Sequence, residues 1–345
     1  MNPMNLFLWF ALIVLSFYLM IVGKALLIPL VIAIVIWYLI NALTRNYQSL
    51  ALGNWKPPYS LCLAAAILTF IAVIWFMIEL TSSNIAQVMK VAPNYQENLQ
   101  KIIAKVLTFL RVEEAPNLTQ LVSHFDFSQI LSKLVGALTS IASNAGIILL
   151  YLIFLLIEQK SFDQKIAALG AADPKREASI RQLIGRINVD IQTYLWIKTL
   201  VSLLTAGVSW ILMKLIGVDL AGFWALVIFL LNYIPNIGSI LGTLFPSLVA
   251  LVQFGTLYPF LMVAGSLGVV QFVIGNILEP RLMGRSLNLS PLVIFLSLVL
   301  WGTIWGILGM ILCVPIMVIM MIVLTHFPQT RPIAILLSGD GRIKT

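Results

Sequence analysis

Apolar runs of about twenty residues, most of them free of charge, follow one another along this sequence. A helix rises about 1.5 Å per residue, so about twenty apolar residues cross a hydrocarbon core of about 30 Å. Six runs have the length of a simple span: Leu6–Val22, Ala25–Leu43, Tyr59–Leu80, Gly136–Ile157, Tyr194–Val218 and Leu257–Leu278. These runs predict an all-α, polytopic integral membrane protein.

The composition excludes a soluble fold. Hydrophobic residues make up 61% of the chain and charged residues 10%, against about 45–50% and about 25% in a typical soluble domain. So few charges cannot cover so much apolar surface, and the lipid bilayer is the expected surrounding. The formal net charge of +8 then reflects the excess of Lys and Arg in cytoplasmic loops. We expect no nucleic-acid partner.

Two further apolar stretches, Leu220–Phe254 and Leu289–Leu324, are too long for one crossing. Each contains helix breakers near its middle, at 232–238 in the first and at 302–306 in the second. Irregular backbone at membrane depth persists only where protein buries it or water reaches it. Each stretch therefore fits a re-entrant hairpin or one broken, tilted span. We expect about eight membrane segments, including two broken or re-entrant helical hairpins.

Charged interludes between the apolar runs predict the organisation of the chain. Apolar positions at helical spacing make residues 81–135 and 158–193 amphipathic helical segments, which pack against neighbours or headgroups or, for 81–135, form an oligomer contact. Lys and Arg gather in short loops of one side, which places both termini in the cytoplasm. We expect three N-terminal membrane helices (1–80), an extracytoplasmic segment (81–135), a membrane helix (136–157), a cytoplasmic segment (158–193), a C-terminal membrane transport region (194–330) and a cytoplasmic tail (331–345).

The first apolar run resembles a signal peptide in length, but it lacks a basic n-region and an A-x-A site. A second run follows within a few residues. We therefore expect a retained helix in a tight hairpin that turns at Gly23.

Polar residues in the C-terminal region mark a candidate transport path. Polar side chains within lipid tend to face a bundle interior or a water-filled pathway; the alternative is interhelical hydrogen bonding of about 1 kcal/mol or less per pair. Gln271, Asn276 and Glu279 follow on the next helix along the chain. At 100° per residue, these three polar residues share one half of an α-helix. The predicted path comprises Asn232, Pro235, Asn236, Gly238, Gln271, Asn276 and Glu279, and the predicted hinge and packing positions are Gly242, Gly302, Gly306 and Pro315.

No catalytic or metal-binding pattern occurs in the sequence. H-E-x-x-H, G-x-S-x-G and Walker motifs are missing, and the two histidines are far apart in the chain. The two cysteines, Cys62 and Cys313, lie in apolar runs and predict no disulfide framework. We expect no enzyme, no catalytic residue, no metal and no cofactor.

The chain resembles the autoinducer-2 exporter family of bacterial membrane proteins at residues 231–242, 276–284, 289–292 and 306–315. Asn236 stands where this family often has an aromatic residue, and Leu289-Ser290-Pro291 replaces the common Leu-His-Pro. The resemblance implies an inner-membrane transporter with about eight membrane segments. It also implies a homo-oligomer, with a pentamer as the expected form. Some members of the family resemble exporters of the quorum-sensing signal autoinducer-2, and others resemble sodium/proton antiporters.

Three functional hypotheses remain at this point. The first is export of a small hydrophilic solute such as autoinducer-2, which the scarcity of buried carboxylates favours because only Glu279 reaches the predicted path. The second is a sodium/proton antiporter. The third is a non-transporting scaffold, which has no need of a proline-broken helix lined by polar residues. The partners expected are a small polar solute or a cation, the bilayer, and other copies of the chain.

Overall fold

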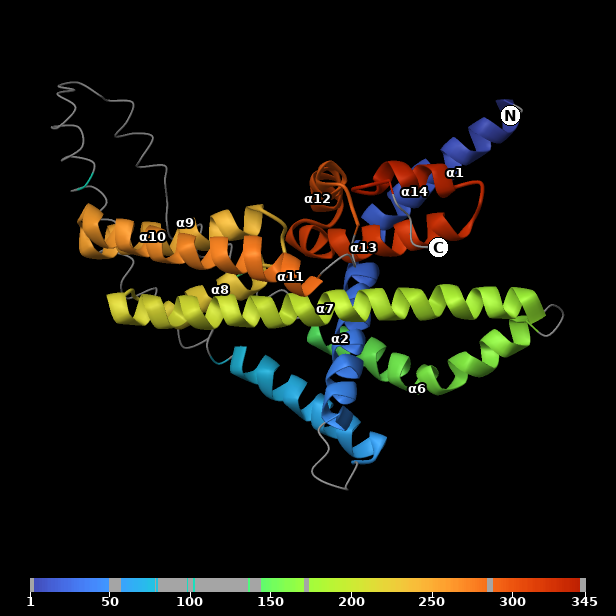
Figure 1. The fold of residues 1–345 in the computed structure, drawn as a ribbon, viewed down its shortest axis with the longest axis horizontal. Helices are drawn as coiled ribbons and strands as arrows, with labels where there is room; N and C mark the ends of the chain where they lie inside the picture. The colour runs from blue at the N-terminus through green and yellow to red at the C-terminus, as the bar shows by residue number, and fades with distance from the viewer. Residues whose placement is uncertain are drawn as a thin grey trace. The chain divides into compact units, whose positions relative to one another are not determined.

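The computed structural model describes residues 3–49, 57–77, 79, 98, 102, 136, 144–170, 174–283 and 288–341. Within these ranges the backbone is helical, and the extended pairing is limited to one isolated bridge between Leu289 and Ser338. The elements in Figure 1 are α1 (Pro3–Val22), α2 (Lys24–Ser49), a helix Tyr59–Met77, α6 (Ala145–Gly170), α7 (Pro174–Ile216), α8 (Ala221–Leu231), α9 (Ile237–Phe254), α10 (Leu257–Phe272), the π-helix η1 (Val273–Leu278), α11 (Glu279–Met283), α12 (Pro291–Trp305), α13 (Ile307–His326) and α14 (Arg331–Leu337). The all-α prediction is confirmed.

Within the described part of the chain, six helices are long and apolar enough to cross a membrane: Lys24–Ser49, Tyr59–Met77, Glu177–Ile216, Ile237–Phe254, Leu257–Met283 and Ile307–His326. Shorter apolar helices accompany them, including α8 and α12. Many large apolar side chains on these helices are exposed, as lipid-facing residues are, and Phe10, Trp75 and Leu203 are more than half exposed. The prediction of a polytopic membrane protein is therefore confirmed. Most of the predicted outer segment, 81–135, lies outside the described residues.

The chain forms two compact units, which are described separately. The first unit comprises residues 1–66, 144–196 and 283–345, and the second comprises 67–143 and 197–282. Helix α7 contributes its N-terminal part to the first unit and its C-terminal part to the second. It contains 43 residues, which at about 1.5 Å per residue is about 65 Å, more than twice the hydrocarbon thickness.

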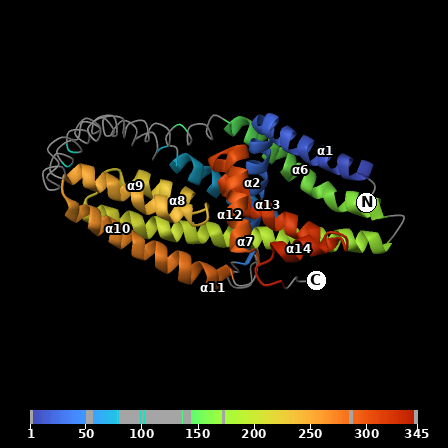
Figure 2. The same cartoon turned by 90° about the horizontal axis from the view of Figure 1, so that it is seen from above.

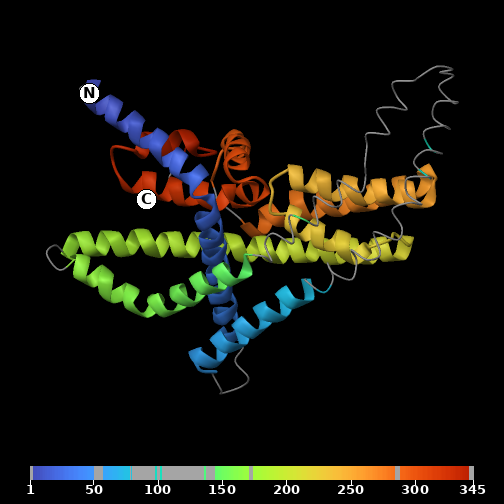
Figure 3. The same cartoon turned by 180° about the vertical axis from the view of Figure 1, so that it is seen from behind.

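In the first unit, polar side chains join α2 to α6 and α7, and Figure 3 shows α2 passing beside α6. Trp37 Nε1 donates to Gln159 Oε1 at 2.9 Å, and Tyr38 Oη donates to Asn188 Oδ1 at 2.8 Å. The predicted hairpin at Gly23 is wrong. Helices α1 and α2 do end and begin there, but Figure 2 shows α1 leading away from α2 instead of folding back on it.

The C-terminal part of the first unit is built on the break between α12 and α13. A Cβ at Gly309 would lie 1.9 Å from the carbonyl oxygen of Trp301, so the two helices approach so closely that only glycine fits. Gly306, at the break, has φ +65. Ser290 N donates to Leu337 O at 3.0 Å, which ties the segment before α12 to the end of α14.

In the second unit, α7 from Ile197 onward is followed by α8, α9, α10, η1 and α11, and the helix Tyr59–Met77 contributes its end from Ile67 onward. Helices α9 and α10 lie side by side in Figures 1 and 2 and are joined by a short turn at Gly255. Gln253 at the end of α9 fixes the loop between α7 and α8: its Oε1 accepts from the Asp219 amide and its Nε2 donates to Gly217 O, both at 2.8 Å. The unit is thus closed at one end by side-chain to backbone bonds.

Helix boundaries differ from the predicted segments around residues 158–193. Helix α6 continues to Gly170, and α7 begins at Pro174 and runs to Ile216 without interruption. The charged residues of this region therefore lie on extensions of membrane helices. The expected breaks in the two long apolar stretches are confirmed, at 232–236 and at Gly306.

Candidate transport site

The break between α8 and α9 is shaped by its backbone. Helix α8 ends at Leu231 and α9 begins at Ile237. A Cβ at Gly238 would lie 1.8 Å from the Leu231 carbonyl oxygen, so glycine is required for α9 to start so close to the end of α8. Asn236 has φ 59, a region that few residues other than Gly and Asn adopt. Its side chain is exposed, and Pro235 is half-buried.

Helix α7 supplies polar partners for the same break. The Asn232 side chain is buried, and its Nδ2 donates to Ser202 Oγ at 3.1 Å. The hydroxyl groups of Thr199 and Tyr233 share a hydrogen bond of 2.7 Å. Asn232 thus makes the interhelical hydrogen bond that was the alternative to a direct solute contact.

A buried ion pair lies within the same unit. Lys198 Nζ on α7 is 2.5 Å from Glu279 Oε1 on α11, and the two side chains are 7% and 18% exposed. Lys198 is the one charged side chain among the buried residues that the structure describes. A charge held in an apolar surrounding is costly unless it is paired. No three His, Cys, Asp or Glu side chains gather within the described ranges as a metal site would need.

Sequence reasoning missed Lys198, although a signal was present. Lys198 lies inside the apolar run Tyr194–Val218. A charged residue within a predicted membrane helix calls for a buried partner. Glu279, itself a predicted path residue, is that partner.

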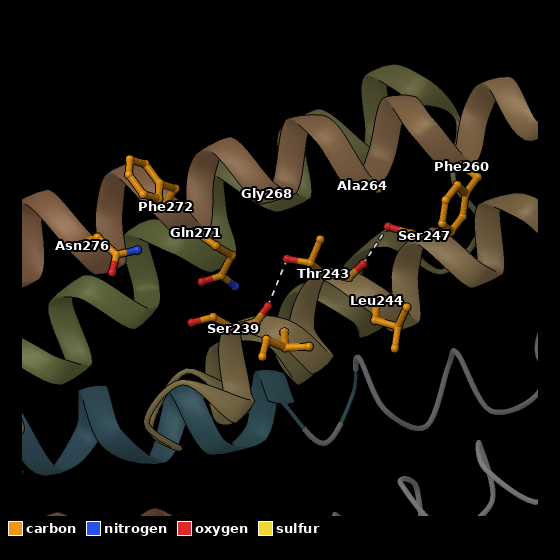
Figure 4. A pocket seen from close by; sticks show the side chains of 11 residues that line it. Ser239, Thr243, Leu244, Ser247, Phe260, Ala264, Gly268, Gln271, Phe272 and Asn276 are labelled. Carbon is orange, nitrogen blue, oxygen red and sulfur yellow. Dashed lines mark hydrogen bonds between the residues drawn. The ribbon is translucent and has the colours of Figure 1, made fainter. Parts of the chain in front are cut away.

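A groove runs between α9 and α10 in the second unit (Figure 4). Its volume is about 440 Å³, within the usual range of small-molecule sites. Two predicted path residues, Gln271 and Asn276, line it from α10 and η1. From α9 it is lined by three hydroxyl residues that sequence reasoning missed, although their spacing of four places them on one helical face: Ser239, Thr243 and Ser247.

The angular prediction for the polar residues of this helix is wrong, because residues 273–278 form a π-helix and not an α-helix. A π-helix bonds residue i to i+5, so it turns less per residue than the 100° that was assumed. Gln271 and Asn276, five residues apart, come to the same groove, whereas Glu279 pairs with Lys198. The polar residues that were expected on one helical face are therefore divided between the groove and the Lys198–Glu279 ion pair.

The predicted hinge and packing positions fall in both units. Gly242, in the second, faces Gln271: a Cβ there would lie 3.3 Å from Gln271 Nε2. The others belong to the first unit. A Cβ at Gly302 would lie 2.8 Å from the flexible end of Met310, and Pro315 is buried inside α13.

Comparison with known proteins assigns the family. The model of the AI-2E family transporters matches residues 7–329. The AI-2 transport protein TqsA of Escherichia coli K12 is 30% identical over 316 residues, which cover 90% of this chain and 89% of TqsA. A putative transport protein of Haemophilus influenzae is 32% identical over 320 residues, covering 91% of this chain and 89% of the relative. The putative transport protein YhhT of E. coli K12 is 31% identical over 276 residues, covering 78% and 76%.

Proposed function

Because this chain belongs to the AI-2E transporter family, we propose that it exports a small hydrophilic solute across the bacterial inner membrane, and that autoinducer-2 is the first solute to test. The name of the relative TqsA supports autoinducer-2 as that first candidate. In this proposal the protein is not an enzyme and the solute crosses unchanged. Both termini lie in the cytoplasm, as the distribution of Lys and Arg predicts.

The observation that carries the proposal is the set of polar groups held among the apolar helices of the second unit. These are the Asn232 amide beside the α8–α9 break, the Lys198–Glu279 pair, and Gln271 at the groove. Polar groups in lipid are costly and mark solute or ion pathways by default. Transporters that bind solute at discontinuous helices offer a structural analogy. The residues from Asn232 to Glu279 therefore form the proposed path.

A second candidate, a sodium/proton antiporter, is supported by the Lys198–Glu279 pair. Ionisable side chains that pair within a membrane protein often belong to proton relays. If the Lys198–Glu279 pair opens, each side chain can exchange a proton. A scaffold without transport would gain nothing from this pair or from the broken helix. We further propose that the active form is a homo-oligomer, a pentamer in the first instance, which light scattering in nanodiscs measures directly.

Flux into proteoliposomes is the test of the proposed function. We expect purified protein to carry labelled autoinducer-2 and small polyols in a saturable manner, and to leave sodium uptake at the level of empty liposomes. Neutral solutes are expected because the groove offers neutral donors and acceptors. Sodium uptake coupled to a pH change, with no solute flux, would instead establish the antiporter.

A further inference from the structure

We propose that the α9–α10 groove is the solute-binding site and that it selects neutral, polyhydroxylated molecules over charged ones; this inference rests on the proposed transport function. The groove is the space between one hydroxyl-bearing face of α9 and one amide-bearing face of α10 and η1 (Figure 4). Four observations carry the proposal: the hydroxyls of α9, the amide of Gln271, the π-helix, and the charge and shape of the walls.

The α9 face accepts hydrogen bonds. Thr243 Oγ1 donates to the Ser239 carbonyl at 3.0 Å, and Ser247 Oγ donates to the Thr243 carbonyl at 2.7 Å. Each hydroxyl has one proton, and these two protons are used within the helix. The oxygen lone pairs that remain can only accept. A ligand that contacts Thr243 or Ser247 must therefore bring its own donors, as the hydroxyls of a polyol do.

The Gln271 amide is a built element of the site. The residue is 7% exposed, and its side chain points between the two helices toward the α9 face in Figure 4. It has no hydrogen-bond partner among the described residues, and its amide atoms are not sealed within the protein, so a ligand in the groove can reach them. Gly242 lies against its Nε2 and leaves room for this side chain. An amide offers two N–H donors and a carbonyl acceptor, and a hydroxyl group can both accept from the N–H and donate to the carbonyl.

The π-helix places a second amide at the same groove. Asn276 lies within η1 and lines the groove together with Gln271. A π-turn is rare and occurs frequently at functional sites. In an uninterrupted α-helix, positions five apart would be 140° apart, so Asn276 would point away from Gln271. The irregular turn thus brings two amides to the groove, one on the buried Gln271 and one on the exposed Asn276.

The walls decide the class of ligand. Among the residues that the structure describes, none of those lining the groove is charged, and the other lining residues are apolar or small. An ion in the groove would meet no opposite charge among these residues, and a charge beside an apolar wall is costly unless it is paired. A neutral polyol instead places its hydroxyls on the amides and hydroxyls and its C–H face on the apolar wall. A Cβ at Gly268 would meet no atom within 4 Å, so the groove has free space at that point.

Equilibrium binding of labelled ribitol to the detergent-purified full chain tests the site, with ribonate as the charged counterpart. We expect saturable ribitol binding, and at least tenfold weaker binding of ribonate. Gln271→Leu removes the amide at nearly constant volume and should weaken ribitol binding about five- to tenfold. Gly268→Leu fills the free space and should weaken ribitol binding at least tenfold. Leucine has a higher helix propensity than glycine, so the substitution should preserve folding.

Gly265→Leu is the matched control, because Gly265 lies on the same helix, has open space around it and does not line the groove. It should leave ribitol binding unchanged. Absence of ribitol binding, equal binding of ribonate, or unchanged binding by both Gln271→Leu and Gly268→Leu would overturn the inference. Binding without any solute flux would refute the transport function and leave the site standing. Solute flux that is unchanged by both substitutions would support the transport function and refute the groove as the binding site.

Discussion

Glu279→Gln is expected to reduce solute flux at least tenfold and to lower the thermal stability of the protein. The substitution leaves Lys198 charged, 7% exposed and without its carboxylate at 2.5 Å. Removing one partner of a buried pair costs about 3–5 kcal/mol, because the other charge stays buried and unpaired. Lys198→Gln should have a similar effect for the same reason. Flux in proteoliposomes and melting in detergent measure the two consequences.

The double charge reversal, Lys198→Glu with Glu279→Lys, separates pairing from the individual residues. It restores opposite charges across the same gap, so we expect it to recover most of the stability lost in either single variant. Glu158→Gln is the matched control. Glu158 pairs with Lys165, but those side chains are 51% and 61% exposed, and exposed pairs contribute about 0–1 kcal/mol. Normal flux and a normal melting temperature of Glu279→Gln would show that the ion pair contributes neither to transport nor to stability.

Gly238→Ala is expected to prevent formation of the α8–α9 break and to abolish the detergent-stable protein. The added methyl group would lie 1.8 Å from the Leu231 carbonyl oxygen, inside a helix junction with no flexible side chain to move aside. Overpacking of this kind costs about 1–3 kcal/mol or more. Gly309→Ala should have the same effect at the second break, where the added methyl group would lie 1.9 Å from the Trp301 carbonyl oxygen.

Size-exclusion yield and melting temperature report the outcome of the glycine substitutions. Gly265→Ala is the control, since it adds the same methyl group to a helix at an open position. It should be neutral or slightly stabilising, because alanine favours helix over glycine by about 1 kcal/mol. If Gly238→Ala melted like Gly265→Ala, the close approach of α8 and α9 would not be required for the fold.

The sequence predicted the membrane fold and both helix breaks because these depend on local properties. Apolar run length decides which segments cross the bilayer, and the polar Asn232 beside Pro235, which lacks a backbone N–H, favours a break at this point of the chain. The hairpin at Gly23 failed for the opposite reason. A glycine between two apolar runs marks an interruption, but packing with the rest of the unit decides the angle between α1 and α2.

The candidate site was predicted only in part, because its members depend on contacts between distant segments. Gln271 and Asn276 were found as polar residues in an apolar helix, and the structure brings both to the groove. The π-helix that aligns them has no recognisable sequence signal, so the α-helical angles misplaced Glu279. Lys198 and the Ser239, Thr243 and Ser247 row were overlooked, although both follow from charge and spacing in the sequence.

One measurement tests most directly whether solute passes through the second unit at the groove. Ser239→Cys, in a background where the buried Cys62 and Cys313 are replaced by Ala, places a thiol on the α9 face that lines the groove. Ser266→Cys on α10, outside the groove, is the control. We predict that a membrane-impermeant thiol reagent stops solute flux through Ser239→Cys, and that saturating solute slows the modification. Undiminished flux through fully modified Ser239→Cys protein would contradict the account.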